Sequence, residues 1–203
     1  FGASLDKDTA QGCVKAAVDN GVNFFDNADA YARGEAERVL GQIIRDLGLN
    51  RQHLVLSSKL FWPMSDDVND RGLSRKHIME SITGSLRRLG TDYVDLYYCH
   101  RYDKNTPVVE VVRAMEDLVR QGKVLYWGTS TWTAAQLEDA VGTARSLNGY
   151  LPQVEQPRYN MFDRHIEPEI LPTCAKYGIG VTVFSPLAGG LLTGKYNTGI
   201  PED

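Results

Sequence analysis

The sequence predicts an α/β fold with a parallel β-sheet covered by helices. Short apolar runs rich in β-branched and aromatic residues alternate along the chain with longer amphipathic segments of helical period. Three of these segments end in a glycine just before the next apolar run, in "DNG", "RQG" and "KYG". Such regular alternation implies right-handed crossovers, which produce a parallel sheet.

Each element follows from a local pattern. The predicted strands, in chain order, are "VNFFD" (22–26), "HLVLSSKL" (53–60), "YVDLYYCH" (93–100), "VLYWGTS" (124–130), "QVEQPRY" (153–159) and "VTVFSPL" (181–187). The predicted helices span residues 9–20, 35–47, 74–89, 108–121, 134–146 and 168–177. Ser74 is a favourable N-cap for the third helix, because its side-chain oxygen can accept a hydrogen bond from an early backbone N–H.

The composition is that of a globular chain, and it excludes several kinds of partner. The 203 residues, 42% of them hydrophobic and 24% charged, suffice for a single domain spanning 1–203. A net charge of -4 and a pI near 5.6 offer no basic surface to nucleic acid or to an anionic membrane. No apolar run approaches the roughly 20 residues of a membrane-spanning helix, so we expect no membrane insertion.

The cysteines indicate neither a disulfide framework nor a metal site. Cys13, Cys99 and Cys174 are odd in number and widely spaced, without a C-x-x-C pair. A cytoplasmic location is therefore expected, with no bound metal.

The loops favour a TIM (β/α)8 barrel over a doubly wound sheet. A doubly wound nucleotide-binding fold would carry a glycine-rich turn after its first strand, whereas "FFDNADAY" has no glycine there. Instead Asp26, Lys59 and His100 stand at the C-terminal ends of three successive predicted strands, and Tyr31 follows the first of them. In a barrel these ends converge on one face, where active sites are built.

Each of these four residues has a structural explanation when taken alone. Asp26 fits a capping carboxylate, Tyr31 a rim aromatic, Lys59 a snorkelling side chain and His100 a satisfied core imidazole. Together they predict proton-transfer chemistry. We expect the ammonium of Lys59, held by Asp26, to lower the pKa of the Tyr31 phenol, while His100 donates a hydrogen bond to a substrate oxygen.

A second motif, "GGLLTGKY" at 189–196, matches most of a phosphate-binding P-loop. Tyr196 replaces the hydroxyl residue that would hold magnesium, and "NTGIPED" follows where a helix should begin. A nucleoside triphosphatase is therefore disfavoured, although backbone N–H groups of such a segment can cradle a diphosphate.

Taken together, several segments of the sequence resemble the aldo-keto reductases. The signature segments are "GVNFFDNADAY", "SSKL", "DLYYCHRYD", "YWGTSTW", "EQPRYNMF" and "FSPLAGGLLTGKY". The segments "SDDVNDRGLSRKHI" and "GKVLYWGTSTWT" are most similar to the branch that includes voltage-gated potassium channel β-subunits. The resemblance implies a catalytic tetrad of Asp26, Tyr31, Lys59 and His100, with Tyr31 as the proton donor.

The resemblance also implies that NADP(H) binds without a Rossmann fold. The nicotinamide would lie near Asp26, Ser130, Thr131 and Gln156, and Phe184 takes the place of the aromatic residue that stacks on it. The pyrophosphate side would be lined by Ser185, Pro186, Leu187, Ala188, Gly189 and Lys195. The residues alone do not distinguish NADP from NAD.

Two departures from the family pattern affect what we expect. Asn27 stands where threonine is usual. The six predicted strands align with strands 2–7 of the barrel, so the sequence is expected to be a fragment that lacks the first strand, the eighth strand and the C-terminal helices, and its activity as such is an open question. It ends before the family segment whose arginine binds the 2′-phosphate of NADP.

The expected function is reduction of a small aldehyde or ketone to an alcohol with NADPH. The alternative is an NADPH-binding regulatory or redox-sensing subunit of an ion channel or transporter, with little turnover. His100 favours catalysis, because mammalian channel β-subunits carry asparagine there. The channel-type resemblance suggests a homotetramer and a channel partner, whereas Phe61, Trp62 and Trp132 indicate only an aromatic mouth around an unidentified substrate.

Overall fold

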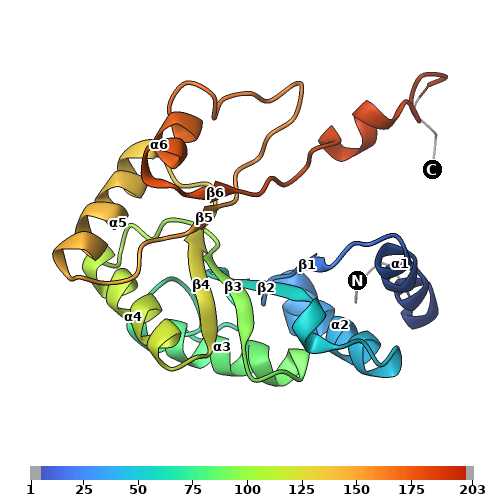
Figure 1. The fold of residues 1–203 in the computed structure, drawn as a ribbon, viewed down its shortest axis with the longest axis horizontal. Helices are drawn as coiled ribbons and strands as arrows, with labels where there is room; N and C mark the ends of the chain where they lie inside the picture. Colours follow the sequence, from blue (N-terminus) through green and yellow to red (C-terminus); the bar gives the residue numbers. More distant parts are fainter. Residues whose placement is uncertain (1–5, 200–203) are drawn as a thin grey trace.

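A computed structural model, which describes residues 6–199, contains a single sheet of parallel strands in the order β1-β2-β3-β4-β5-β6. The strands are β1 (Phe24–Asp26), β2 (Val55–Leu60), β3 (Val94–Cys99), β4 (Val124–Thr129), β5 (Val154–Glu155) and β6 (Gly180–Val181). The helices are α1 (Lys7–Asp19), α2 (Glu35–Asp46), α3 (Arg75–Leu89), α4 (Val108–Arg120), α5 (Ala134–Ser146) and α6 (Ile170–Tyr177). Figure 1 shows the helices on the outside of a curved sheet, which forms half of a barrel.

The predicted partial (β/α)8 barrel is confirmed, and so is the punctuation of its helices. The Ser74 side chain accepts from the backbone N–H of His77 and so caps α3. Gly122 and Gly178, which end α4 and α6, have φ values of 69° and 70°. Glycine adopts this left-handed conformation without the steric cost that a Cβ would bring.

The last two predicted strands, 153–159 and 181–187, were predicted too long. β5 and β6 keep only two residues each, followed by an isolated parallel bridge between Arg158 and Phe184. Pro157 explains the interruption in β5, because it has no N–H to donate to a neighbouring strand. The pairing resumes when the N–H of Phe184 donates to the carbonyl of Pro157 at 3.0 Å.

The hydrophobic core lies between the outer face of the sheet and the helices. It includes Leu60 and Tyr97 from the sheet and Ile43, Ile82 and Met115 from helices α2, α3 and α4, all with no exposed surface. Because strand side chains alternate between the two faces, the neighbours of Leu60 and Tyr97 point the opposite way, into the barrel interior. Lys59 and Tyr98 occupy that inner face.

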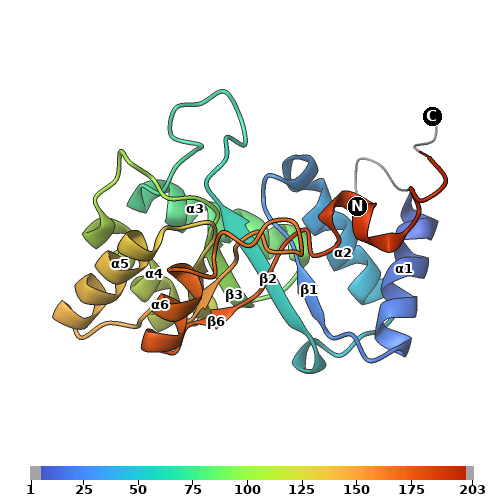
Figure 2. The ribbon, with the colours of Figure 1, turned by 90° about the horizontal axis from the view of Figure 1, so that it is seen from above.

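The register of the sheet determines which residues meet inside the barrel. Asp26 pairs with Ser57 in the next strand, and Lys59 pairs with Tyr98 in the strand after that. The C-terminal ends of these strands therefore lie together on one side of the sheet. In Figure 2, seen from above, the segment that follows β6 crosses in front of β1 and β2, whereas Figure 1 shows that it lies apart from these strands and from α1.

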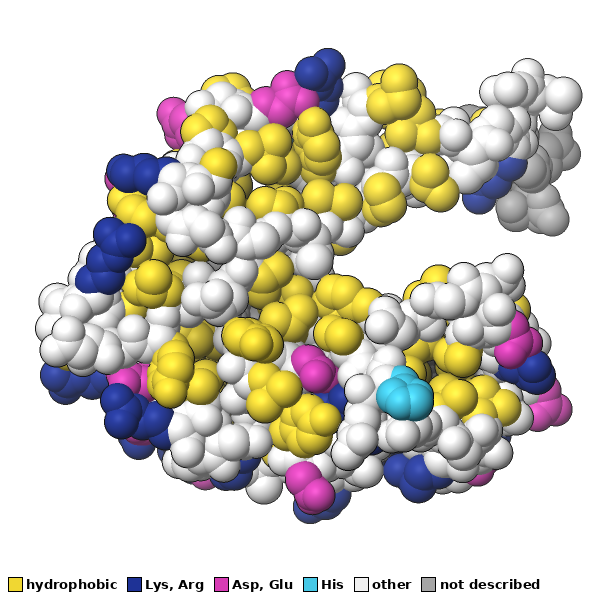
Figure 3. All heavy atoms as spheres, viewed as in Figure 1, with side chains coloured by type: hydrophobic (Ala, Val, Ile, Leu, Met, Phe, Trp, Pro, Cys, Tyr) yellow, Lys and Arg dark blue, Asp and Glu magenta, His cyan; other side chains and the backbone are white. Residues whose placement is uncertain are grey.

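Seen as spheres, the molecule has an open, C-shaped outline, and apolar side chains line part of its hollow (Figure 3). Tyr126, which shares the inner face with Tyr98, is 54% exposed. Among residues 6–199, no helix combines the length and apolar character needed to cross a membrane.

Candidate active site

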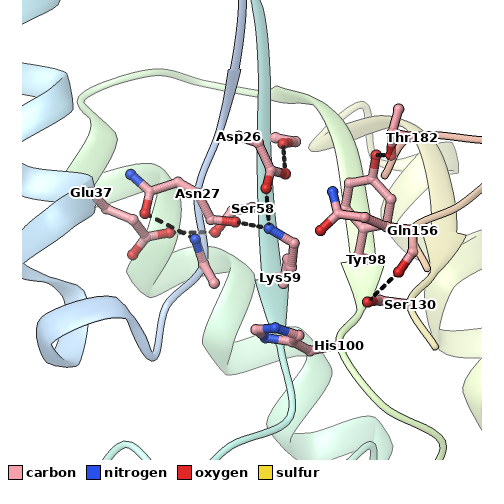
Figure 4. Close-up of polar contacts among 12 residues, drawn as sticks. Asp26, Asn27, Glu37, Ser58, Lys59, Tyr98, His100, Ser130, Gln156 and Thr182 are labelled. Atoms are coloured by element: carbon pink, nitrogen blue, oxygen red, sulfur yellow. Dashed lines mark hydrogen bonds and ion pairs between the residues drawn. The ribbon is translucent and has the colours of Figure 1, made fainter. Parts of the chain in front are cut away.

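The centre of the site is an ion pair between two neighbouring strands. The Nζ of Lys59, which has no exposed surface, donates to Oδ2 of Asp26 at 2.5 Å and to the backbone carbonyl of Asn27 at 2.7 Å. The second carboxylate oxygen of Asp26 accepts from the hydroxyl of Ser57 at 2.5 Å. Figure 4 shows Asp26 and Lys59 facing each other across β1 and β2. Both ends of the pair are thus held by further hydrogen bonds.

Tyr31 lies on the η1 turn (Tyr31–Gly34), which directly follows the loop after β1. The Nζ of Lys59 lies 5.2 Å from the centroid of the Tyr31 ring, so the phenol and the ammonium are close neighbours. The loop is tied to β2 by two backbone bonds, from Asn27 to the Ser57 carbonyl and from Asp29 to the Lys59 carbonyl, both 3.1 Å. These bonds fix the position of Tyr31 relative to the ion pair.

His100 follows β3 and lies between two aromatic rings. Its imidazole packs edge to face against Tyr31, with ring centroids 5.9 Å apart, and against Trp62 at 6.2 Å. Burial, followed by the charges of Lys59 and Arg101, lowers the pKa of His100 to about 3. The imidazole is therefore neutral at physiological pH, with one nitrogen to donate and one to accept.

The structure corrects one electrostatic expectation. The pKa of Tyr31 is raised, not lowered, because partial burial disfavours the phenolate and the charge of Asp26 adds to this effect. The charge of Arg101 opposes these two effects but does not outweigh them. Burial also lowers the pKa of Lys59, and the charge of Asp26 opposes that shift. Tyr31 accordingly holds its proton at neutral pH.

Ser130, Thr131 and Gln156 lie together at the ends of β4 and β5. The hydroxyl of Ser130 donates to the backbone carbonyl of Gln156 at 2.8 Å. Figure 4 shows Ser130 on the side of Tyr98 away from Asp26, whereas the side-chain amide of Gln156 extends past the Tyr98 ring to the side that faces Asp26 and Lys59. Thr131 has a φ of 59°, a conformation that costs a β-branched residue about 1–3 kcal/mol. Backbone strain of this kind is concentrated at functional sites.

A buried carboxylate that the sequence reasoning did not single out supports this strained turn. Glu155 has no exposed surface, and it accepts from the hydroxyl of Thr129 and, at 3.1 Å, from the backbone N–H of Trp132. Burial raises its pKa to about 7. No sequence signal beyond the presence of a glutamate within a predicted strand indicated this role.

The predicted cofactor residues Phe184 to Lys195 lie on the segment that leaves β6. The residues concerned are Phe184, Ser185, Pro186, Leu187, Ala188, Gly189 and Lys195. Among the described contacts this segment is joined to the loop after β5, for example by the Asn160 side chain donating to the Ser185 carbonyl at 3.0 Å, rather than to the Asp26 and Lys59 pair. The structure therefore brings the four predicted catalytic residues together, and it places the predicted cofactor residues of the segment after β6 in a separate group.

The mouth of the site differs from the expected set of three aromatic residues. Trp62 is 40% exposed beside His100, whereas Trp132 is only 1% exposed and packs against Tyr102 with ring centroids 4.9 Å apart. A cavity of about 490 Å³, lined in part by Phe61 and Trp62, opens next to this mouth. Trp132 is therefore a packing residue, and only Phe61 and Trp62 face open space.

Arg101 is a residue of the site that sequence reasoning missed. Its Nη1 donates to the backbone carbonyl of His100 at 2.5 Å and lies 3.4 Å from the hydroxyl of Ser130. The only sequence signal was its position directly after His100. The guanidinium connects the end of β3 with the end of β4.

A second polar network holds the site from behind, between the sheet and the helices. Glu37 of α2 has no exposed surface, and its carboxylate accepts from Nε of Arg88 at 2.5 Å and from the hydroxyl of Ser58 at 2.6 Å. Ser58 neighbours Lys59 on β2 but points to the opposite face (Figure 4). The network links α2 and α3 to the strand that carries Lys59.

Comparison with known proteins gives matches along the whole chain. Proteins described as "Probable voltage-gated potassium channel subunit beta" from Oryza sativa subsp. japonica and Arabidopsis thaliana are each 53% identical over 205 residues, covering 100% of this chain. A "Putative voltage-gated potassium channel subunit beta" from Schizosaccharomyces pombe is 46% identical over 199 residues, covering 97% of this chain. The chain spans 62% of the length of the first two relatives and 58% of the third.

The comparison with protein families agrees with the half-barrel. The profile described as "Aldo/keto reductase family" matches residues 1–203. The chain belongs to the aldo/keto reductase family.

Proposed function

We propose that the protein reduces an aldehyde or ketone to an alcohol with NADPH, and that Tyr31 donates the proton. The observation that carries this proposal is the fully buried ammonium of Lys59, bound to Asp26 at 2.5 Å, directly beside the Tyr31 ring. A bound reduced nicotinamide would supply a hydride to the carbonyl carbon. The protein's own groups would manage the charge that then develops on the carbonyl oxygen.

Tyr31 suits the role of acid because its raised pKa keeps the phenol protonated in the resting site. As the carbonyl oxygen gains negative charge, its affinity for a proton rises above that of the phenolate, and the proton moves from the Tyr31 hydroxyl to this oxygen. The ammonium of Lys59 then lies next to the phenolate and stabilises it until a proton returns from solvent.

His100 suits the role of a neutral hydrogen-bond donor. Its pKa of about 3 excludes the imidazolium at neutral pH, so His100 does not compete with Tyr31 as the acid. A neutral imidazole can still donate one N–H to the substrate oxygen and orient the carbonyl towards Tyr31. The packing of His100 between Tyr31 and Trp62 supports a fixed ring orientation.

The described residues fit a nicotinamide dinucleotide. Ser130, Thr131 and Gln156 present polar groups at the C-terminal ends of β4 and β5, on the same side of the sheet as the C-terminal ends of β1 to β3. Ser185, Ala188 and Gly189 all have positive φ, as backbone that turns its N–H groups towards an anion does. Lys195 is exposed and adds a positive charge near this segment. We propose NADP(H) as the cofactor held by these two groups of residues.

A second candidate function rests on the relatives named as potassium channel β-subunits. In this alternative the protein binds the same cofactor and associates with a channel, and its slow or absent turnover serves regulation. A homotetramer would be one candidate form of such a subunit. The location of the protein in the cytoplasm is part of both proposals.

Turnover with the natural full-length protein distinguishes the two. Purified protein is mixed with NADPH and a short aldehyde, and NADPH oxidation and alcohol formation are both measured. Equal amounts of NADP and alcohol formed over many turnovers support the reductase. Tight NADPH binding without turnover, together with a co-purifying channel protein, supports the regulatory subunit; absence of NADPH binding contradicts both.

A further inference from the structure

Arg101 holds a positive charge at the mouth of the proposed active site. Within the described part of the chain, only its Nη1 is engaged, by the carbonyl of His100 and the hydroxyl of Ser130. A guanidinium carries five N–H donors in a planar fork. Among residues 6–199, no carboxylate forms an ion pair with Arg101, so the donors on Nε and Nη2 are available to a ligand.

The surroundings hold this guanidinium in place and direct its charge into the site. Its Cζ lies 5.6 Å from the centroid of the Trp62 ring, and the same ring lies 6.2 Å from the imidazole of His100. Stacking on an aromatic face orders the arginine without using its donors. Arg101 is half-buried, and its field reaches Tyr31, Lys59 and His100, whose ionisation it affects.

The acids nearby do not cancel this charge. Asp26 is bound by Lys59 and Ser57, and Glu155 is buried and bound by Thr129 and the backbone of Trp132. The mouth therefore carries one unmatched positive charge with free donors, next to the imidazole proposed to orient the carbonyl. Planar forked donors recognise a carboxylate by two parallel hydrogen bonds.

We propose that Arg101 binds the carboxylate of the substrate, and that the preferred substrates are short aldehydes or ketones that carry a carboxylate at the end remote from the reacting carbonyl. The proposal rests on the reductase function proposed above and specifies its substrate class. Trp62, whose ring lies near both the Arg101 guanidinium and the His100 imidazole, would pack along the carbon chain between the two ends of the substrate.

The test compares succinate semialdehyde with its methyl ester, which has the same aldehyde but no charge. The variants are Arg101→Gln, Arg101→Lys and, as a control for loss of positive charge, Arg113→Gln. Arg113 is exposed on α4, outside the site. For the wild type we expect a higher kcat/KM with the acid than with the ester.

Arg101→Gln should lower the preference for the acid on the order of 10- to 100-fold, mainly through KM, because it removes a hydrogen bond to a charged group. Arg101→Lys keeps the charge but loses the forked arrangement of donors, so its preference for the acid should lie between those of the wild type and Arg101→Gln. Arg113→Gln should keep the wild-type ratio of kcat/KM for the acid to kcat/KM for the ester. The preference of the wild type should also decline as salt is added. A ratio that Arg101→Gln leaves unchanged overturns the proposal.

Two binding measurements distinguish this proposal from the proposed reductase function and from a role of Arg101 in cofactor binding. Calorimetric titration with succinate needs no turnover. If the wild type binds succinate and Arg101→Gln weakens this binding, the carboxylate site is supported. If no aldehyde is reduced at the same time, the reductase function alone fails. Titration with NADPH locates the arginine. If Arg101→Gln weakens NADPH binding as strongly as it weakens succinate binding, Arg101 serves the cofactor and the proposal is wrong.

Discussion

The Nζ of Lys59 lies 2.5 Å from Oδ2 of Asp26, yet the two partners differ in exposure: the lysine side chain is fully buried and the aspartate side chain is 35% exposed. Burial of a charge is costly unless a partner compensates it. The lysine therefore depends on the aspartate more than the aspartate depends on the lysine. This asymmetry gives the pair a thermodynamic signature.

Asp26→Asn should destabilise the fold by about 3–5 kcal/mol, because it leaves the ammonium of Lys59 buried without its counter-charge. Lys59→Met removes the buried charge itself, and Asp26 keeps its bond to Ser57 and its access to water, so this variant should lose less stability. Urea unfolding of both variants measures the difference. Equal losses, or a larger loss in Lys59→Met, would show that the pair is not asymmetric.

The stability of Asp26→Asn has a predicted pH dependence. The pKa of Lys59 in the folded protein is already lowered from 10.5, and loss of Asp26 lowers it further. Between the folded and unfolded pKa values the unfolded chain binds more protons, so the stability of Asp26→Asn should rise with pH up to about 10.5. The rise should begin at a lower pH than in the wild type, because the variant has the lower folded pKa. Stability curves that begin to rise at the same pH in both proteins would contradict the prediction.

His100 should contribute to acid sensitivity. Its pKa is about 3 in the folded protein against 6.5 as the ordinary value, so the unfolded chain binds the extra proton first. The contribution to stability is complete above pH 6.5 and is lost as the pH falls towards 3. His100→Gln should therefore have a flatter stability curve over this interval, as measured by urea unfolding at several pH values, whereas identical slopes would argue against a neutral buried imidazole.

The Glu37 and Arg88 pair behind the site offers a matched comparison of buried and exposed charges. Among the described residues, Arg88→Met leaves the fully buried Glu37 with only Ser58 as a hydrogen-bond partner, and it should cost about 3–5 kcal/mol. Lys15→Met breaks the 2.6 Å pair with Asp19, whose side chains are 61% and 57% exposed, and should change stability by less than about 1 kcal/mol. Similar losses in the two variants would mean that the Glu37 network contributes little.

Much of the fold could be predicted because local patterns and long-range packing agree. The helix caps and glycine stops indicated the boundaries of the helices to within a few residues, and α5 begins and ends where its pattern does. The strands after residue 150 were harder. Their apolar pattern continues beyond Pro157, but the missing N–H of this proline interrupts regular pairing between the two strands, which leaves only two residues in each of β5 and β6.

The composition of the site was accessible from sequence, and its electrostatics were not. The polar residues at strand ends pointed to Asp26, Lys59 and His100, because parallel strands bring those ends together. The direction of the Tyr31 pKa shift depends on how deeply the phenol is buried and on the balance between the charges of Asp26 and Arg101, which only the assembled structure shows. Arg101 went unnoticed for the same reason, since its role follows from where its guanidinium lies.

The central claim, that Tyr31 donates the proton, is tested most directly by NADPH oxidation in a single turnover of Tyr31→Phe. Tyr150→Phe is the matched control, because Tyr150 is exposed at 53% and lies in the loop before β5. At saturating NADPH and aldehyde, Tyr31→Phe should react on the order of 100- to 10,000-fold more slowly than wild type, the usual contribution of a positioned acid, with its affinity for NADPH unchanged. A single-turnover rate in Tyr31→Phe equal to those of wild type and Tyr150→Phe would contradict the claim.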